Sequence, residues 1–270
     1  MTDYLRRRVD MDALAPLFDE ATLWGARFAF LMLDELELRA GIRALDIGCA
    51  TGLPLIELAN MHGGKARFTG VDIWSSALHQ AQKRIVFQGL ANTTLVEGDG
   101  HQLPFAHQSF DLIVSNLGIN NFDDPDAVFR ECARVLRPGG RLALTTNVRG
   151  HMRELYDVFR SVLPARYHKR LEANEAHRGT VASLRARIEA AGLEVARVVE
   201  RELRLRFLDG SAMLRHSLVY WFLMGWRAVV DPEDEESVFA ELEHRLDQLG
   251  PLAMTVPMVY VESVKNPRPA

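Results

Sequence analysis

The sequence predicts an α/β fold built on an open, doubly wound, mostly parallel sheet. Between Gly41 and Asn147, short aliphatic runs alternate with longer amphipathic segments, which is the βαβ pattern. The short runs are apolar throughout, as expected of strands that helices cover on both faces. A glycine turn follows the first run, as it does where such sheets bind a ligand. Right-handed crossovers between these strands then give the doubly wound arrangement.

The elements of this region can be read from the sequence in order. The expected strands are IRALDIG, RFTGVDIW, TTLVEGD, FDLIVSN and RLALTTN, and the expected helices are LPLIELANM, SSALHQAQKRIVFQ and DAVFRECARVL. In LRPGGRL, Pro138 and the glycine pair predict the end of a helix, and Arg141 is expected to open the next strand.

The flanking regions predict mainly helices. Residues 11–39 carry an apolar stripe typical of one or two helices. Downstream, helices are expected over residues 149–177, 181–191, 212–230 and 232–249, and strands at LEVARVVERELRLRF and LAMTVPMVYVESV. The segment 212–230 is apolar almost all round, which predicts a helix that is enclosed on every side or that walls a pocket. We expect these parts to cap the sheet.

Composition limits the classes of partner. The chain has 270 residues, of which 48% are hydrophobic and 25% charged, and this suits one large domain with elaborations. A net charge of -4 gives no general attraction to nucleic acid or to anionic membranes. Two cysteines provide neither a disulfide framework nor a metal site. The longest apolar run, residues 218–224, is too short to span a bilayer. We therefore expect a cytoplasmic monomer or homodimer with a small-molecule partner.

The glycine turn narrows the choice of cofactor. A nicotinamide or flavin fingerprint reads G-x-G-x-x-G, but the aligned residues are Gly48, Ala50 and Leu53, so the match fails. The chain instead has an acid before the turn, Asp46, and a second acid, Asp72, at the end of the next strand.

Four blocks together resemble the class I S-adenosylmethionine-dependent methyltransferases, in particular the type 11, UbiE-like small-molecule group. LDIGCATG is similar to their motif I, which usually has glycine at the position of Ala50. VDIW, then GDGHQLPF with SFDLIVSN, and then RVLRPGGRLALTT follow in the family's order, within residues 40–147. The resemblance implies a Rossmann-like, seven-stranded sheet whose last strand is antiparallel. It also implies S-adenosyl-L-methionine as methyl donor and S-adenosyl-L-homocysteine as product.

The resemblance also assigns donor-binding residues. Gly48 and Gly52 would line the donor, and Asp46 would organise the turn and reach the amino acid end, directly or through water. Asp72 would accept the two ribose hydroxyls, and Asp99 the adenine amino group. The other residues implied at the donor are Cys49, Ile73, Trp74, Gly100, His101, Asn116 and Leu117. At Ala50 a methyl group is tolerable if φ is negative.

The acceptor is less constrained. Methyl transfer is a direct displacement, so positioning can suffice, and a base helps where the acceptor is a hydroxyl or a protonated amine. We expect His151 to be that base because it follows the fifth strand closely. The other candidates are His101, His168, His177 and Tyr156, and the predicted substrate-binding residues are Trp24, Asn120, Asn121 and Tyr220.

Two acceptor classes are disfavoured. Enzymes that methylate amino groups of nucleic acid bases have N/D-P-P-aromatic after the fourth strand, where this chain reads SNLGINNF. Arsenite methylation in similar enzymes needs several cysteines. What remains is O-, N- or C-methylation of a small acceptor that is partly apolar or aromatic. The alternative is a non-catalytic subunit or regulator of the same fold that binds the donor.

The expected domain organisation is a helical lid over residues 1–40 and a methyltransferase domain over residues 41–270. The lid would place Phe18, Trp24 and Phe28 over the donor, although the same residues could simply pack on the sheet. Cap insertions are expected at about residues 149–178 and 211–230, where they would roof the acceptor site together with the loop 117–122.

Overall fold

The architecture comes from a computed structural model that describes residues 2–19 and 23–266. Its seven-stranded sheet has the order β3-β2-β1-β4-β5-β7-β6. The first five strands are parallel, and β7 is antiparallel to its neighbours β5 and β6, which confirms the predicted fold class. The strands are β1 (Arg43–Ile47), β2 (Arg67–Asp72), β3 (Thr93–Glu97), β4 (Phe110–Asn116), β5 (Leu136–Asn147), β6 (Leu193–Phe207) and β7 (Leu252–Lys265).

The parallel strands end at one common edge of the sheet. Ile47 lies opposite Val71, Asp72 lies opposite Glu97, and the last residue of β4, Asn116, pairs with β5 at the same edge. The residues that follow β1, β2, β3 and β4 therefore gather there, where ligands of open α/β sheets bind.

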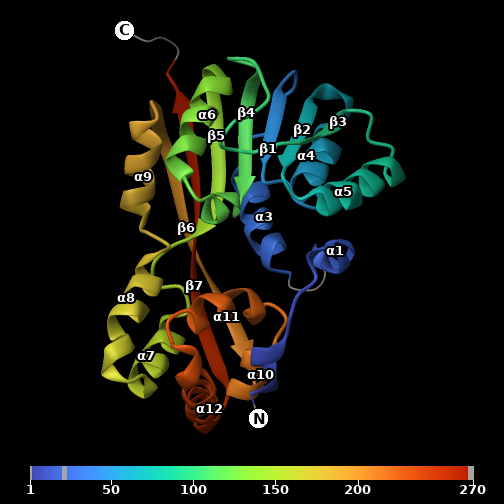
Figure 1. Ribbon diagram of the computed structural model, residues 1–270. Helices are drawn as coiled ribbons and strands as arrows, with labels where there is room; N and C mark the ends of the chain where they lie inside the picture. The colour runs from blue at the N-terminus through green and yellow to red at the C-terminus, as the bar shows by residue number, and fades with distance from the viewer. Residues whose placement is uncertain (1, 20–22, 267–270) are drawn as a thin grey trace. The chain divides into compact units, whose positions relative to one another are not determined.

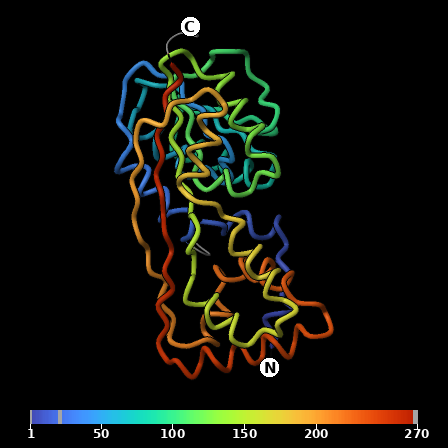
Figure 2. The backbone as a smooth tube through the Cα atoms, turned by 90° about the vertical axis from the view of Figure 1, so that its left-hand side faces the viewer, coloured from blue at the N-terminus to red at the C-terminus, as the bar shows by residue number. Residues whose placement is uncertain are grey.

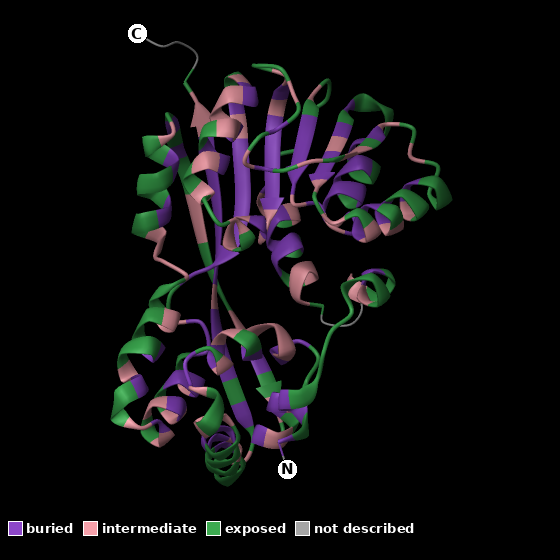
Figure 3. Ribbon diagram, in the orientation of Figure 1, coloured by how far each residue is buried: buried purple, intermediate pink, exposed green. Residues whose placement is uncertain are grey.

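Crossover helices cover the strands as the sequence predicts. They are α4 (Leu55–His62), α5 (Ser75–Phe87), α6 (Pro125–Val135) and α9 (Val181–Ala190). The middle strands are buried along most of their length (Figure 3), which agrees with their unbroken apolar sequence. The larger buried side chains of this core include Leu45, Phe68 and Phe129.

The fifth strand differs from the prediction at its start. It begins at Leu136, directly after α6, and not at Arg141. Leu136 pairs with Phe110, the pairing shifts, and Arg141 then pairs with Leu112. Gly139 has a φ of +77°, and a Cβ on Gly140 would lie 2.8 Å from the Arg137 carbonyl oxygen. The glycine pair therefore builds a bulge within the strand, where it was expected to separate the strand from the helix.

The chain divides into two compact units, which we call the sheet unit and the helical unit. The sheet unit comprises residues 10–146, 181–200 and 259–270, and the helical unit comprises residues 1–9, 147–180 and 201–258. Two long strands, β6 and β7, run side by side at the edge of the sheet (Figure 2), and each contributes residues to both units.

The amino-terminal region is helical over residues 11–19 and 24–35, as its apolar stripe predicts. Within the sheet unit it forms α1 (Met11–Leu14), a 3-10 turn, η2 (Ala15–Leu17), and α3 (Trp24–Glu35). Helix α1 lies near α5 (Figure 1), and α3 begins at the carboxyl end of β4, where Asn116 donates to the Gly25 carbonyl. Residues 2–7, which include the short helix η1 (Asp3–Arg6), belong to the helical unit.

The helical unit contains the inserted segments. Its helices are α7 (Arg153–Val162), α8 (His168–Ala176), α10 (Gly210–Arg215), α11 (Val219–Arg227) and α12 (Pro232–Gln248), with the short turn η5 (Ala165–Tyr167) between α7 and α8. The segment 212–230 therefore contains parts of two helices, α10 and α11, and the expectation of a single helix is wrong. In α11, Leu223 and Trp226 are buried, whereas Met224 is 60% exposed.

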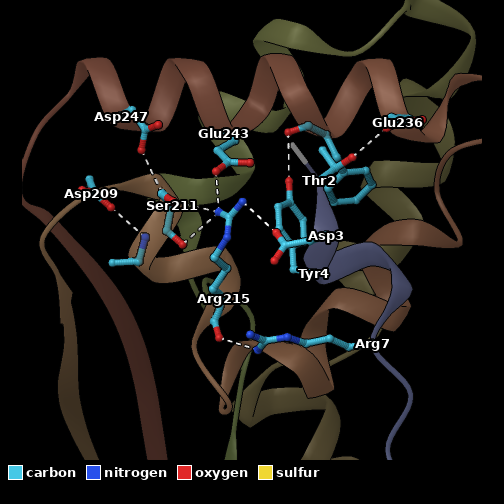
Figure 4. A network of polar contacts seen from close by, with 12 residues as sticks. Thr2, Asp3, Tyr4, Arg7, Asp209, Ser211, Arg215, Glu236, Glu243 and Asp247 are labelled. Carbon is cyan, nitrogen blue, oxygen red and sulfur yellow. Dashed lines mark hydrogen bonds and ion pairs between the residues drawn. The ribbon is translucent and has the colours of Figure 1, made fainter.

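Residues 2–7 are fixed to the helical unit by a polar network centred on Arg215 (Figure 4). The Arg215 guanidinium binds Glu243 and Asp3, and the Arg7 guanidinium donates to the Arg215 carbonyl oxygen over 2.7 Å. Tyr4, which is 1% exposed, donates its hydroxyl to the Phe239 carbonyl.

Among the described residues, no helix is both long and apolar enough to cross a bilayer.

Candidate functional site

The turn after β1 is held against the end of β2 by backbone hydrogen bonds. The N–H groups of Gly48 and Cys49 both donate to the Val71 carbonyl, over 2.9 and 3.2 Å. Gly48 and Gly52 have φ values of +73° and +103°, which L side chains rarely adopt. A Cβ on Gly52 would also lie 2.6 Å from Ile56 in α4. Both glycines are therefore required by the backbone itself.

Ala50 overturns one expectation, because its φ is +43° and not negative. A left-handed L-residue costs roughly 1–2 kcal/mol, and such strain is found mainly at functional sites. The Ala50 N–H donates to Oδ2 of Asp72 over 2.8 Å, and the Trp74 N–H donates to Oδ1 over 2.9 Å. Asp72 thus fixes both the strained turn and the start of α5.

Asp46, the last polar residue of β1, is a buried carboxylate. It is 1% exposed, and neither of its oxygens is hydrogen-bonded with good geometry to any described residue. Burial, with repulsion from Asp72 added, raises the pKa of Asp46 to about 8, and the Leu55 N–H at the start of α4 offsets only part of this. The hydrogen-bonding capacity of the Asp46 carboxyl group, next to the turn, is therefore largely unsatisfied.

The loop after β3 presents a second carboxylate to the same edge. Oδ1 of Asp99 accepts the backbone N–H of His101 over 2.9 Å and lies 2.6 Å from Nδ1 of the same residue. These hydrogen bonds lower the pKa of Asp99. Gly98, just before it, donates its N–H to the Asp72 carbonyl over 3.0 Å, so the loops after β2 and β3 are joined.

Gly100, in the same loop, is packed closely. A Cβ at Gly100 would lie 3.1 Å from the Phe122 ring and 3.3 Å from Ile47. A Cβ at Gly48 would lie 3.5 Å from the Cα of Gly118. The loops after β1, β3 and β4 thus approach one another through positions that carry no side chain.

The end of β4 and the loop after it hold two predicted donor-binding residues, Asn116 and Leu117, and two predicted acceptor-binding residues, Asn120 and Asn121. Asn116 donates Nδ2 to the Gly25 carbonyl over 2.9 Å and accepts the Thr145 hydroxyl over 2.7 Å. Leu117 has a φ of +64°. Asn120 accepts the Thr146 hydroxyl over 2.5 Å, whereas Asn121 is exposed.

Sequence reasoning missed a polar latch between the amino-terminal segment and the turn. Asp19 accepts the Thr51 hydroxyl over 2.8 Å and forms an ion pair with Arg84 of α5. The same guanidinium donates to the Thr51 carbonyl over 3.2 Å. We call Asp19, Thr51 and Arg84 the Asp19 latch. No local pattern signals it, because its members are 32 to 65 positions apart.

The aromatic residues expected to form a lid have different environments. The Phe18 ring meets Trp74 edge-on, with centroids 5.2 Å apart, and the Trp74 indole nitrogen is buried without a hydrogen-bond partner among the described residues. Trp24 is half-buried and packs on Phe28 at 4.8 Å, and Phe28 itself is fully buried. Ile73, by contrast, is 71% exposed.

His151 and Tyr220 belong to the helical unit. His151 is 2% exposed, and its ring meets Phe222 edge-on at 4.7 Å. Burial, with Arg178 nearby, holds the pKa of His151 well below its usual value, so the ring is neutral. Tyr220 is half-buried and donates its hydroxyl to the Arg7 carbonyl over 3.3 Å.

A cavity of about 340 Å³ lies at the opposite, amino-terminal edge of the strands, between residues 36–42, 111–112 and 137–141. Arg137 is paired there with Asp111, and Arg141 with Glu37, so the charges of this cavity are satisfied internally. We therefore assign the site to the carboxyl edge, where Asp46 is unsatisfied. Over residues 2–19 and 23–266, no cluster of three or more His, Cys, Asp or Glu side chains has the geometry of a metal site.

This carboxyl edge, with its strained turn and two carboxylates at successive strand ends, is the candidate ligand-binding site of a Rossmann-like sheet. Residues 45–144 match the family described as "Methyltransferase domain".

Relatives agree with this classification. The chain is 29% identical to a nocamycin O-methyltransferase of Saccharothrix syringae over 95% of its own length and 97% of that protein. It is 37% identical to a demethylmenaquinone methyltransferase of Lactobacillus johnsonii, over 41% of this chain and 46% of that one. The chain thus spans under half of the second relative. The crystal structure of the YcgJ protein from Bacillus subtilis shares the fold, with a TM-score of 0.59 at 21% identity, covering 89% of this chain and 99% of that one.

Proposed function

We propose that this protein transfers a methyl group from S-adenosyl-L-methionine to an oxygen of a small, partly apolar acceptor. The observation that carries the proposal is the buried Asp46 carboxylate beneath the left-handed turn of Gly48 and Ala50. A buried acid whose hydrogen-bonding capacity is largely unused, next to a backbone free of bulky side chains, suits a ligand that brings a cationic amino group.

The residues present fit this donor. Asp46 would meet the ammonium group, directly or through water, and Asp72 would accept the ribose hydroxyls with the lone pairs that its two backbone hydrogen bonds leave over. Exposed Ile73 and half-buried Trp74 would flank the adenine, whose amino group would bind Asp99. Cys49, Gly100, His101, Asn116 and Leu117 would supply backbone and packing around the donor.

Methyl transfer requires mainly that the protein position the acceptor relative to the donor. When bound, the donor supplies an activated methyl group, and the protein holds the acceptor oxygen in line with it and excludes water. Within the sheet unit, Trp24, Asn120 and Asn121 are the groups that we propose for the acceptor. The assignment of Tyr220 to the acceptor stays a prediction.

A base would assist transfer to a hydroxyl. Burial lowers the pKa of His151 and favours its neutral ring, which is the form that can take up a proton. Its small exposure also suits a residue that only supports the fold. The role of His151 as a base therefore stays a prediction, as do the cytoplasmic location and a monomeric or homodimeric state.

The preference for oxygen rests on the relative that aligns along nearly the whole chain, which is named as an O-methyltransferase. The relative aligned over 41% of the chain is a demethylmenaquinone methyltransferase, which keeps an aromatic, apolar acceptor under consideration. N- and C-methylation remain the alternatives.

The test measures binding and turnover separately. Calorimetry should detect binding of S-adenosyl-L-homocysteine, and donor labelled in its methyl group should label at least one member of a panel of phenols, aliphatic alcohols and quinols. Asn120→Ala should keep its affinity for S-adenosyl-L-homocysteine and lose about tenfold or more in turnover. Binding without turnover on every panel member would favour the non-catalytic regulator. Absence of binding would refute the proposal.

A further inference from the structure

The side chain of His101 joins two loops of the candidate site. Its Nε2 lies 3.3 Å from the backbone N–H of Asp124, the residue that caps α6, and its Nδ1 lies 2.6 Å from Oδ1 of Asp99. A backbone N–H can only donate, so Nε2 must be the acceptor and carry no proton. The proton of the neutral ring therefore sits on Nδ1 and is donated to Asp99.

The two oxygens of Asp99 differ in their hydrogen bonding. Oδ1 receives two donors from His101, the backbone N–H and the ring Nδ1–H. Oδ2 makes no hydrogen bond to any described residue, and the Asp99 side chain is 56% exposed. One oxygen is thus held in place, while the other remains open for a ligand.

We propose that His101 is a positioning residue that gives the donor site its selectivity for adenine. By holding Oδ1, the Nδ1–H of His101 fixes the carboxylate plane so that Oδ2 accepts the exocyclic amino group of the adenine. The inference rests on the proposed function, because it needs the nucleoside of the donor beside Asp99. Preorganisation of this kind strengthens binding because the carboxylate need not be ordered when the ligand arrives.

A purely structural role for His101 would depend on a different ring nitrogen. In that role Nε2 would matter, since it ties the loop to the start of α6 through Asp124, and the ring also meets Phe122 edge-on at 5.7 Å. Two substitutions separate the roles. The His101→Asn side chain can place an amide donor near the position of Nδ1, and the longer His101→Gln side chain can place an amide acceptor near that of Nε2.

The experiment compares two ligands by calorimetry on the full chain. They are S-adenosyl-L-homocysteine and S-inosyl-L-homocysteine, which has an oxo group in place of the adenine amino group. The wild type should prefer the adenosyl ligand by about tenfold or more. His101→Ala should weaken the adenosyl ligand by about tenfold and leave the inosyl ligand within about twofold, so that the preference disappears. His101→Asn should restore most of the preference, and His101→Gln should not.

Several results would overturn the inference: an unselective wild type, an unchanged preference in His101→Ala, an equal loss for both ligands, or equal rescue by asparagine and glutamine. The matched control is His107→Ala, which alters an exposed histidine of the same unit and should leave both affinities unchanged. Thermal unfolding reports whether each variant is folded, and the Asn and Gln variants still decide the question if the Ala variant is not. If the wild type binds neither ligand, the proposed function itself has failed.

Discussion

At the scale of single residues, the two acids at the strand ends have opposite environments. Asp46 is buried without a well-formed hydrogen bond, and Asp72 is tied by both oxygens to the backbone around it. The first has hydrogen-bonding capacity left for a ligand or a water molecule, whereas the second shapes the turn before any ligand arrives. The positive φ of Ala50 is tolerated because Asp72 holds its N–H.

We predict that Asp72→Ala weakens binding of S-adenosyl-L-homocysteine by roughly ten- to hundredfold. The loss of charge-assisted hydrogen bonds to the ribose costs about 1.5–3 kcal/mol. Calorimetry measures the effect, and Asp157→Ala, which removes an exposed carboxylate of the helical unit, should bind as the wild type does. Unchanged affinity in Asp72→Ala would show that the ribose lies elsewhere.

At the scale of elements, the amino-terminal segment is bound to the turn by the Asp19 latch and by the contact of Phe18 with Trp74. Asp12, in α1, also accepts the hydroxyl of Ser76 at the start of α5 over 2.7 Å. This segment therefore contacts the elements that would surround the nucleoside. The lid role stays a prediction, and these contacts give it a specific test.

We expect Asp19→Ala to weaken binding of S-adenosyl-L-homocysteine by roughly three- to tenfold. The substitution removes a half-buried ion pair and the hydrogen bond to Thr51, so the turn is less ordered before binding. The matched control is Asp34→Ala, an exposed acid of α3. Limited proteolysis should also cut the segment before residue 40 faster in Asp19→Ala. Equal affinity and equal cleavage in the two variants would rule the latch out.

At the scale of the whole molecule, buried titrating groups make stability depend on pH. The pKa of Asp46 is about 8 in the folded chain, against an ordinary value of 3.8. Between these values the folded state binds the proton and the unfolded state does not. The contribution of Asp46 to stability is therefore complete below pH 3.8 and is lost as pH rises towards and past 8. The lowered pKa of His151 acts in the opposite sense, because its contribution is lost as pH falls below 6.5.

The corresponding prediction compares the wild type with Asp46→Asn, which cannot ionise. Relative to that variant, the wild type should lose roughly 2–4 kcal/mol in free energy of unfolding between pH 5 and pH 8.5. Urea denaturation at several pH values provides the measurement. The histidine contribution cancels, since both proteins retain His151. Stability curves that run parallel would mean that Asp46 is ionised in the folded chain over this range.

Local pattern was sufficient for most of the elements. The strands β1 to β4 and the helices α4, α5 and α6 lie where the apolar runs and amphipathic segments predict them. The bulge at Gly139 and Gly140 was not foreseen. Proline and glycine at these positions are compatible with the end of an element and also with a bulge inside a strand. The break between α10 and α11 was missed for a related reason, since an apolar run does not show where a helix ends.

By itself, the sequence determined the fold class, the resemblance to methyltransferases and the order of the four motif blocks. These follow from periodicity and from short motifs whose members are neighbours in the chain. Only the tertiary structure decided that Asp46 is buried without a well-formed hydrogen bond, that Ala50 is left-handed, and that Asp19 and His101 join separate loops. Burial and hydrogen bonding depend on residues that are distant in sequence and meet only when the strands align their carboxyl ends.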